Sequence, residues 1–225
     1  MSLKWRLAIR VALVLPLIIA LVFGPAGSFR FWQGWVFVGL FAMFNAFFLG
    51  YFYRRDPGLI ARRLKNKEQT SEQRRFRMLW LPLWFAALVL PGLDYRFGWS
   101  AAFGGVPVWL AVAGQVLLAC SWLLIFQVFR FNSFASTVVE VTQGQRVIAG
   151  GPYRVVRHPM YSAFVMMIVA LPFALGSYMA MAPAVWLIPL VVYRLIHEES
   201  LLRRELPGYV EYCENTRFRL VPRVF

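Results

Sequence analysis

The sequence is poor in the residues that build disulfide frameworks and metal sites, because its 225 residues include only two cysteines and two histidines. Cys120 lies in an apolar block and Cys213 in a polar C-terminal segment, so we expect neither a disulfide nor a thiolate metal site. Two histidines also make a zinc or di-iron site improbable. No Gly-x-Gly-x-x-Gly fingerprint occurs, which excludes the soluble dinucleotide-binding fold.

Charge is also scarce. Only 15% of the residues are charged and 60% are hydrophobic, whereas a soluble domain has about 25% charged and about 45–50% apolar residues. The apolar excess forms long charge-free blocks, and no polar stretch is long enough to fold as a second domain. We therefore predict an all-α integral membrane protein with a single structural domain.

The apolar blocks are long enough to cross about 30 Å of hydrocarbon, which takes roughly 20 residues per helix. The last block, Pro159 to Tyr193, would measure about 52 Å as one helix, so we expect Leu175-Gly176-Ser177 to divide it into a hairpin. This predicts a bundle of six crossings, or five if the hairpin is shallow. We interpret residues 1–28 as an uncleaved first helix, although a secretory signal has a similar pattern. The four predicted spans before the hairpin are at 7–24 (the apolar part of this first helix), 31–53, 78–94 and 106–129. A polar loop is predicted at 54–77.

Basic residues alternate along the chain. The N-terminus, the 54–77 loop, the 130–158 segment and the tail from Arg194 are rich in Lys and Arg, whereas the turns between them have one or none. This pattern predicts that both termini are cytosolic. The net charge of +14 then marks a face suited to anionic lipid, and we expect no nucleic acid as partner.

Within the 54–77 loop, Asp56 followed by Pro57 is typical of a helix start. Leu59, Ile60 and Leu64 alternate with basic residues, which fits a helix lying in the membrane interface. A solvated connector remains an alternative.

Two motifs at the basic face carry chemistry. Gly150-Gly151-Pro152-Tyr153-Arg154 is a turn whose glycines allow a ligand close to the backbone. Arg157-His158-Pro159-Met160-Tyr161 opens the hairpin, with His158 beside the N-cap, and predicts an anion site at the helix start. Membrane-interface anchoring is the alternative for the second motif.

A third motif, Arg194-Leu195-Ile196-His197-Glu198-Glu199, closes the hairpin. Its two glutamates at a helix C-terminus face the negative end of the helix dipole, although pairs such as Arg194–Glu198 and Glu199–Arg203 would make them tolerable. If the hairpin is antiparallel, its two ends meet. An anion site and a carboxylate pair would then line one pocket suited to a zwitterionic ligand.

From Asn132 onward, these motifs, preceded by Gly144-Gln145-Arg146-Val147-Ile148 and followed by Leu206-Pro207-Gly208-Tyr209-x-Glu211-Tyr212, resemble the isoprenylcysteine carboxyl methyltransferase and phospholipid methyltransferase family. Segments near 55–59 and at Asp94-Tyr95-Arg96-Phe97 are similar to its bacterial members. The resemblance implies a location in the bacterial inner membrane. It divides the chain into helices 1–129 and a region 130–225 that holds the cofactor and includes the hairpin 159–197 and a C-terminal lid.

The resemblance also implies S-adenosylmethionine (SAM) as cofactor, bound in a pocket open to the cytosol, and a lipophilic acceptor that enters from the bilayer. Arg194 would face the acceptor, and Glu199 would share the catalytic role. The residues implied to bind the cofactor are Gln145, Arg146, Val147, Ile148, Tyr153, His158, Pro159, Tyr161, Glu198 and Glu199.

The acceptor stays open at this stage. A carboxylate needs only an arginine to orient it, whereas an amine or thiol would need a base such as His158 or a glutamate. Isoprenylcysteine carboxyl O-methylation is the main prediction, and phospholipid N-methylation or thiol methylation are alternatives. An NADPH-dependent sterol-type reductase and a non-catalytic membrane protein are weaker ones. We expect the polar residues inside the spans, Asn45, Gln115, Ser121 and Gln127, to form hydrogen bonds between helices.

Overall fold

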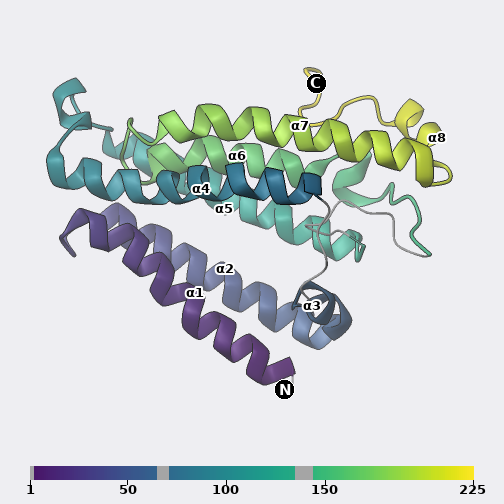
Figure 1. The fold of residues 1–225 in the computed structure, drawn as a ribbon, viewed down its shortest axis with the longest axis horizontal. Coiled ribbons are helices and arrows are strands. Elements are labelled where there is room, and N and C mark those ends of the chain that lie inside the picture. The colour runs from purple at the N-terminus through teal and green to yellow at the C-terminus, as the bar shows by residue number, and fades with distance from the viewer. Residues whose placement is uncertain (1–2, 65–70, 135–143) are drawn as a thin grey trace.

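The computed structural model describes residues 3–64, 71–134 and 144–225. Within these residues the chain is helical, with no β-strand. Figure 1 shows long helices whose connections alternate between two ends of the molecule. The elements are α1 (Leu3–Ala26), α2 (Trp32–Arg55), α3 (Pro57–Leu64), α4 (Ser71–Phe97), η1 (Ser100–Phe103), α5 (Val108–Phe131), η2 (Gly151–Arg154), α6 (Pro159–Ala174), α7 (Met181–Glu205) and α8 (Tyr209–Asn215).

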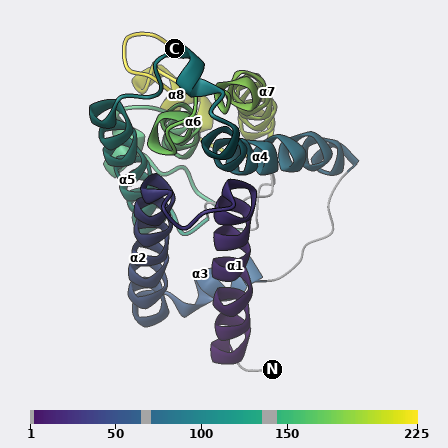
Figure 2. The ribbon, with the colours of Figure 1, turned by 90° about the vertical axis from the view of Figure 1, so that its left-hand side faces the viewer.

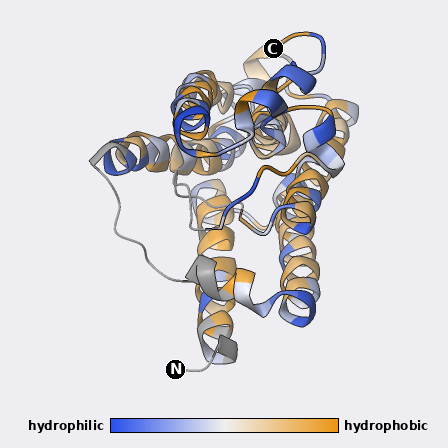
Figure 3. Cartoon of the chain, turned by 90° about the vertical axis from the view of Figure 1, so that its right-hand side faces the viewer, coloured by the Kyte–Doolittle hydropathy of each residue, from blue (hydrophilic) through white to orange (hydrophobic). Residues whose placement is uncertain are grey.

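Five of the described helices, α1, α2, α4, α5 and α7, are long and apolar enough to cross a membrane. Hydrophobic residues dominate α1, which starts at the N mark in Figure 3, along most of its length. The remaining predicted crossing, the first arm of the hairpin, is α6, whose 16 residues span about 24 Å. It is shorter than a hydrocarbon core of about 30 Å. The predicted all-α membrane bundle is thus confirmed, with α6 as the short arm of the C-terminal hairpin.

The short helix α3 follows the predicted signal. Asp56 accepts a hydrogen bond from the Leu59 backbone N–H at 2.9 Å, so its carboxylate caps the helix that begins at Pro57. Leu59 and Ile60 are buried against Phe52 and Phe126. The apolar side of α3 therefore packs on the bundle, and α3 crosses near the ends of α1 and α2 (Figure 2).

Close helix contacts depend on two glycines. A Cβ at Gly114 would lie 2.5 Å from the backbone N of Ala174, so α5 and α6 touch backbone to backbone. A Cβ at Gly92 would lie 2.7 Å from the Val22 carbonyl oxygen, which brings α4 equally close to α1. Small residues serve this purpose in membrane bundles because lipid provides no hydrophobic driving force between helices.

Buried polar groups form hydrogen bonds between the helices at the end of the bundle opposite the basic loops. The Gln115 side chain donates to the carbonyls of Ala174 at 2.7 Å and Gln33 at 3.2 Å, as predicted for an interhelical partner. The same prediction is wrong for Asn45 and Ser121, whose side chains donate to carbonyls of their own helices, at Phe41 and Leu118. Asp94, at the end of α4, accepts bonds from the Ser100 backbone and hydroxyl and from the Ser177 hydroxyl. Asp94 therefore joins α4 to the turn between α6 and α7 and positions the hairpin.

Candidate functional site

The start of α6 is organised by the tail of the chain. His158 is the N-cap residue and Pro159 occupies the first helical position, as the motif predicts. The backbone N–H groups of Arg157 and His158 donate to the carbonyls of Phe218 (2.8 Å) and Arg219 (3.0 Å). The tail thus returns alongside this turn and fixes its backbone.

The two ends of the hairpin meet, as expected for an antiparallel pair. The Tyr161 hydroxyl on α6 donates to Glu198 Oε2 on α7 at 2.6 Å and accepts a bond from Arg194 Nε at 3.2 Å. The Arg194 guanidinium also lies 4.6 Å from the centre of the Phe76 ring on α4. One hydrogen-bonded chain therefore runs from an arginine through a phenol to a carboxylate across α6 and α7, and the arginine also contacts an aromatic ring of α4.

Glu199 occupies a different environment from its neighbour, with only 4% of its side chain exposed. Its oxygens contact four basic side chains from three segments of the chain. These are Arg203 (2.9 Å), Arg219 (2.9 Å), His158 (3.4 Å) and Arg157 (3.6 Å). The predicted Glu199–Arg203 pair is present, and the carboxylate ties α7 to the tail and to the start of α6.

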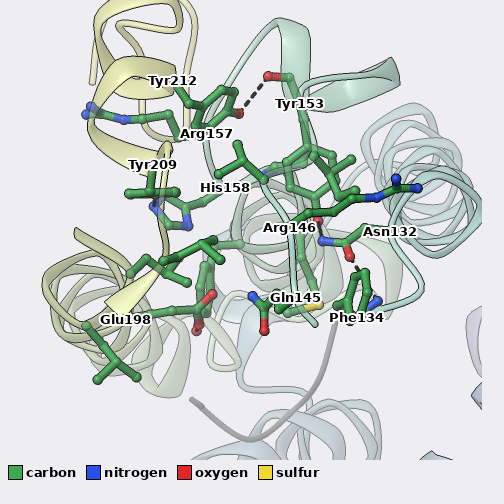
Figure 4. Close-up of a pocket in the computed structure, with 18 residues that line it drawn as sticks. Asn132, Phe134, Gln145, Arg146, Tyr153, Arg157, His158, Glu198, Tyr209 and Tyr212 are labelled. Carbon is green, nitrogen blue, oxygen red and sulfur yellow. Dashed lines mark hydrogen bonds between the residues drawn. The ribbon is translucent and has the colours of Figure 1, made fainter. Parts of the chain in front are cut away.

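A pocket opens beside this network, with an empty volume of about 780 Å³ that includes space open to solvent. Nine of the predicted cofactor residues line it, from Gln145 to Glu198, whereas Glu199 does not. Figure 4 shows Tyr209 and Tyr212 of α8 on one side of the pocket and Asn132 and Phe134 on the other. The full lining is Asn132, Phe134, Gln145, Arg146, Val147, Ile148, Tyr153, Arg157, His158, Pro159, Met160, Tyr161, Glu198, Leu201, Leu202, Leu206, Tyr209 and Tyr212.

Tyrosines close the pocket as neutral hydrogen-bonding groups. The Tyr212 hydroxyl donates to the Tyr153 carbonyl at 2.7 Å, and the Tyr209 hydroxyl lies 3.2 Å from His158 Nε2. Burial raises the pKa of Tyr212 to about 12 and the pKa values of Tyr153 and Tyr209 further. All three phenols therefore keep their protons at neutral pH.

The glycine turn works as expected. Gly151 has φ +57°, and a Cβ there would lie 2.5 Å from the Phe131 ring. Only glycine fits this position, which presses the turn against the end of α5. Tyr153 then reaches back, and its hydroxyl accepts a bond from the Asn132 side-chain amide at 2.9 Å.

A second cavity adjoins the first. It is lined by α4, α6 and α7, and it shares Met160 and Tyr161 with the polar pocket. Its walls are mostly aromatic and aliphatic, with two arginines at one end. The lining residues are Gln73, Phe76, Arg77, Trp80, Leu81, Met160, Tyr161, Phe164, Val191 and Arg194. We call this cavity the α4–α6 groove.

Sequence reasoning missed part of this arrangement. Tyr209 and Tyr212 lie three residues apart and so share a face of α8, a signal that could have placed them in the pocket. Phe76 and Arg77 lie at the start of α4, within the stretch expected to be a polar loop. In the described parts of the chain, no group of three or more His, Cys, Asp or Glu side chains is arranged to hold a metal ion.

Comparison with known proteins agrees with the motifs. Residues 109–207, from the start of α5 through the whole hairpin, match the family described as phospholipid methyltransferase. No curated protein matches the chain. The match confirms the predicted resemblance over this stretch, which holds most of the residues of the polar pocket.

Proposed function

Starting from the methyltransferase family that residues 109–207 match, we propose that this chain transfers a methyl group from SAM to a lipophilic acceptor, most like an isoprenylcysteine carboxylate. The observation that carries the proposal is the junction of two unlike cavities at Met160 and Tyr161. A polar pocket suits a water-soluble donor. An apolar groove between membrane helices suits an acceptor dissolved in the bilayer.

The residues of the polar pocket fit SAM. Glu198 would bind the ammonium group, and Arg157, whose Nε is buried with no hydrogen-bond partner among the described residues, offers a donor to the carboxylate. Val147, Ile148 and Tyr153 would pack against the adenosine portion. When bound, SAM supplies a methyl group on a positively charged sulfur, and the acceptor displaces that sulfur in line.

The chain's own contribution is alignment. Tyr161 is hydrogen-bonded to Glu198 on the donor side and to Arg194 on the acceptor side. The relative position of the two substrates would therefore be set by one side chain with well-defined bonds. Since methyl transfer needs no covalent help from the protein, correct placement of the reacting atoms can supply most of the rate.

The charges of the α4–α6 groove favour an anionic acceptor. Arg77 and Arg194 lie in its wall, and a guanidinium group binds a carboxylate through paired hydrogen bonds. A carboxylate also needs no base before it is methylated.

Glu199 would act as a positioning residue behind the pocket, since its oxygens contact Arg203 and Arg219.

Phospholipid N-methylation is the second candidate. Glu198 lines the polar pocket and accepts a hydrogen bond from Tyr161, which lines both cavities, so its carboxylate could accept a proton from an amine that reaches Tyr161. The arginines would then hold the lipid phosphate.

The test is transfer of radiolabelled methyl groups from SAM in proteoliposomes, with N-acetyl-S-farnesylcysteine or phosphatidylethanolamine as acceptor. Treatment with base releases a methyl ester as methanol and leaves an N-methyl group in place. We expect base-labile label in the farnesylated acceptor. Base-stable label in phosphatidylethanolamine would support the second candidate. No transfer to either acceptor or to a total lipid extract would count against both, and thermal protection by NADPH in place of SAM would favour a reductase.

A further inference from the structure

A second lipid-facing cavity lies between α1 and α2. It has an empty volume of about 1,050 Å³, including its open side. The lining residues are Leu7, Arg10, Val11, Val14 and Leu15 of α1, Phe41, Ala42, Asn45, Ala46, Phe48 and Leu49 of α2, and Ile60 of α3. We call it the α1–α2 groove.

Near their connection, α1 and α2 are in close contact. There, Gly34 of α2 lies against Val22 and Phe23 of α1. Toward the other end, the small side chains of Ala42 and Ala46 leave the space between the helices unfilled. Figure 2 shows the two helices side by side with α3 across their far end.

The length of the groove along the helix axes is close to the thickness of one membrane leaflet. Its wall on α1 runs from Leu7 to Leu15 and its wall on α2 from Leu49 to Phe41, about 12 Å along each helix. One leaflet contributes about 15 Å of hydrocarbon. The groove therefore begins at the basic end of the bundle and stops near the middle of the membrane, as an acyl chain of a lipid in that leaflet does.

Charge points to the kind of headgroup. Among the described residues that line the groove, Arg10 carries the one charge, and it lies at the basic end, beside the start of the apolar stretch Ile9–Ala26. Arg54 and Arg55 line a neighbouring hollow on α2 that shares Ala46 with the groove. A lipid phosphate at this level would meet positive charge, and its chain would lie along Val11, Val14 and Leu15.

The groove is separate from the α4–α6 groove and from the polar pocket, with which it shares no lining residue. The buried rings of Phe52, Phe126 and Phe129 form a packed cluster with Ile60 of the groove wall, and Met160 of the other two cavities packs against the same cluster. A lipid whose contacts stay within the α1–α2 groove would not touch Tyr161, so it would not be the methyl acceptor.

We propose that the α1–α2 groove is a binding site for an anionic phospholipid of the leaflet at the basic face, with its phosphate at Arg10 and one acyl chain between α1 and α2. This site is independent of the proposed methyl transfer. It gives a specific location to the anionic lipid that the charge pattern of the sequence predicts.

The experiment uses the full chain in phosphatidylcholine nanodiscs with a trace of phosphatidylglycerol that carries a photoreactive diazirine in its acyl chain. After illumination, labelled peptides are mapped by mass spectrometry. We expect label concentrated in residues 7–15 and 41–49, and we expect unlabelled phosphatidylglycerol to compete better than phosphatidylcholine. Arg10→Gln should reduce that preference about fivefold, which is the contribution of one basic residue near an anionic surface.

Two controls keep the result specific. Arg30→Gln removes an exposed charge at the opposite end of α1 and should leave the preference unchanged. Ala46→Phe fills the groove and should reduce the labelling, whereas Val36→Phe, on α2 outside the groove, should not. Label spread evenly over lipid-facing helices, equal competition by both lipids, or an unchanged preference in Arg10→Gln would overturn the proposal. A chain that is dimeric in detergent and takes up no lipid label in the groove would instead identify the groove as a self-association surface.

Discussion

Replacing Tyr161 by phenylalanine removes one hydroxyl at the junction of the two cavities and leaves the ring in place. That hydroxyl donates to Glu198 and accepts from Arg194. Hydrogen bonds to charged groups are worth about 1.5–3 kcal/mol each. If the bond to Glu198 contributes that much to alignment in the transition state, the rate of methyl transfer should fall about ten- to hundredfold.

The assay is methyl transfer from radiolabelled SAM in proteoliposomes, with kcat and KM measured for donor and acceptor separately. We expect the main loss in kcat, because both binding surfaces remain while their relative position is less constrained. Tyr193→Phe is the matched control, since Tyr193 is an exposed tyrosine on α7. It should keep the activity of the unmodified chain.

A wild-type kcat in Tyr161→Phe, with unchanged thermal stability, would show that the Tyr161 hydroxyl does not align the two substrates. It would mean that Glu198 and Arg194 hold their positions without the bridging hydroxyl. A loss confined to the KM for SAM would assign Tyr161 to donor binding alone.

Three further substitutions test the architecture. Gly114→Ala should lower the free energy of unfolding by about 1–3 kcal/mol, because its Cβ would clash with the backbone of α6. Gly39→Ala, whose Cβ would meet nothing within 4 Å, is the control and should leave the free energy of unfolding unchanged. Thermal unfolding in detergent compares the two variants. Glu199→Gln should destabilise the chain by about 3 kcal/mol or more, because buried Arg157 loses its counter-charge. Glu205→Gln, at an exposed position, is the control. An equal effect of the two substitutions would contradict the positioning role of Glu199. Arg194→Lys should raise the acceptor KM while leaving SAM binding intact, since lysine keeps the charge but not the planar group over Phe76; an unchanged acceptor KM would remove Arg194 from the acceptor site.

The sequence was most informative where local signals determine structure. Hydrophobic blocks predicted the long helices, Asp56-Pro57 predicted the start of α3, and His158-Pro159 predicted the start of α6. The meeting of the hairpin ends also followed from local rules, because two antiparallel helices joined by a tight turn must bring their far ends together.

Long-range contacts could not be predicted in this way. Glu198 and Glu199 are adjacent and differ by about 100° around the helix axis, so one faces the pocket and the other faces the tail. The surroundings of Glu199 depend on Arg219, which belongs to the C-terminal segment and is distant in sequence. The same limit applies to the start of α4. Because this stretch is rich in arginine, the sequence predicted a loop where the structure has the first turns of α4. Long basic side chains can extend along an apolar surface to the membrane interface, so they are compatible with the end of a membrane helix.

The α1–α2 groove was not predicted either. Each helix taken alone reads as an ordinary apolar span. The cavity arises from the small residues Ala42 and Ala46 and from the local contact at Gly34, which only the packed structure brings together.

The most direct test of the account is equilibrium binding of SAM to the purified chain in detergent, measured by calorimetry. We expect saturable binding of SAM and none of NADPH, together with a weaker affinity in Glu198→Gln. We also expect loss of binding when Glu198, Glu199 and His158 are replaced together. Unchanged SAM affinity in that triple variant, provided it remains folded, would contradict the assignment of the polar pocket as the donor site.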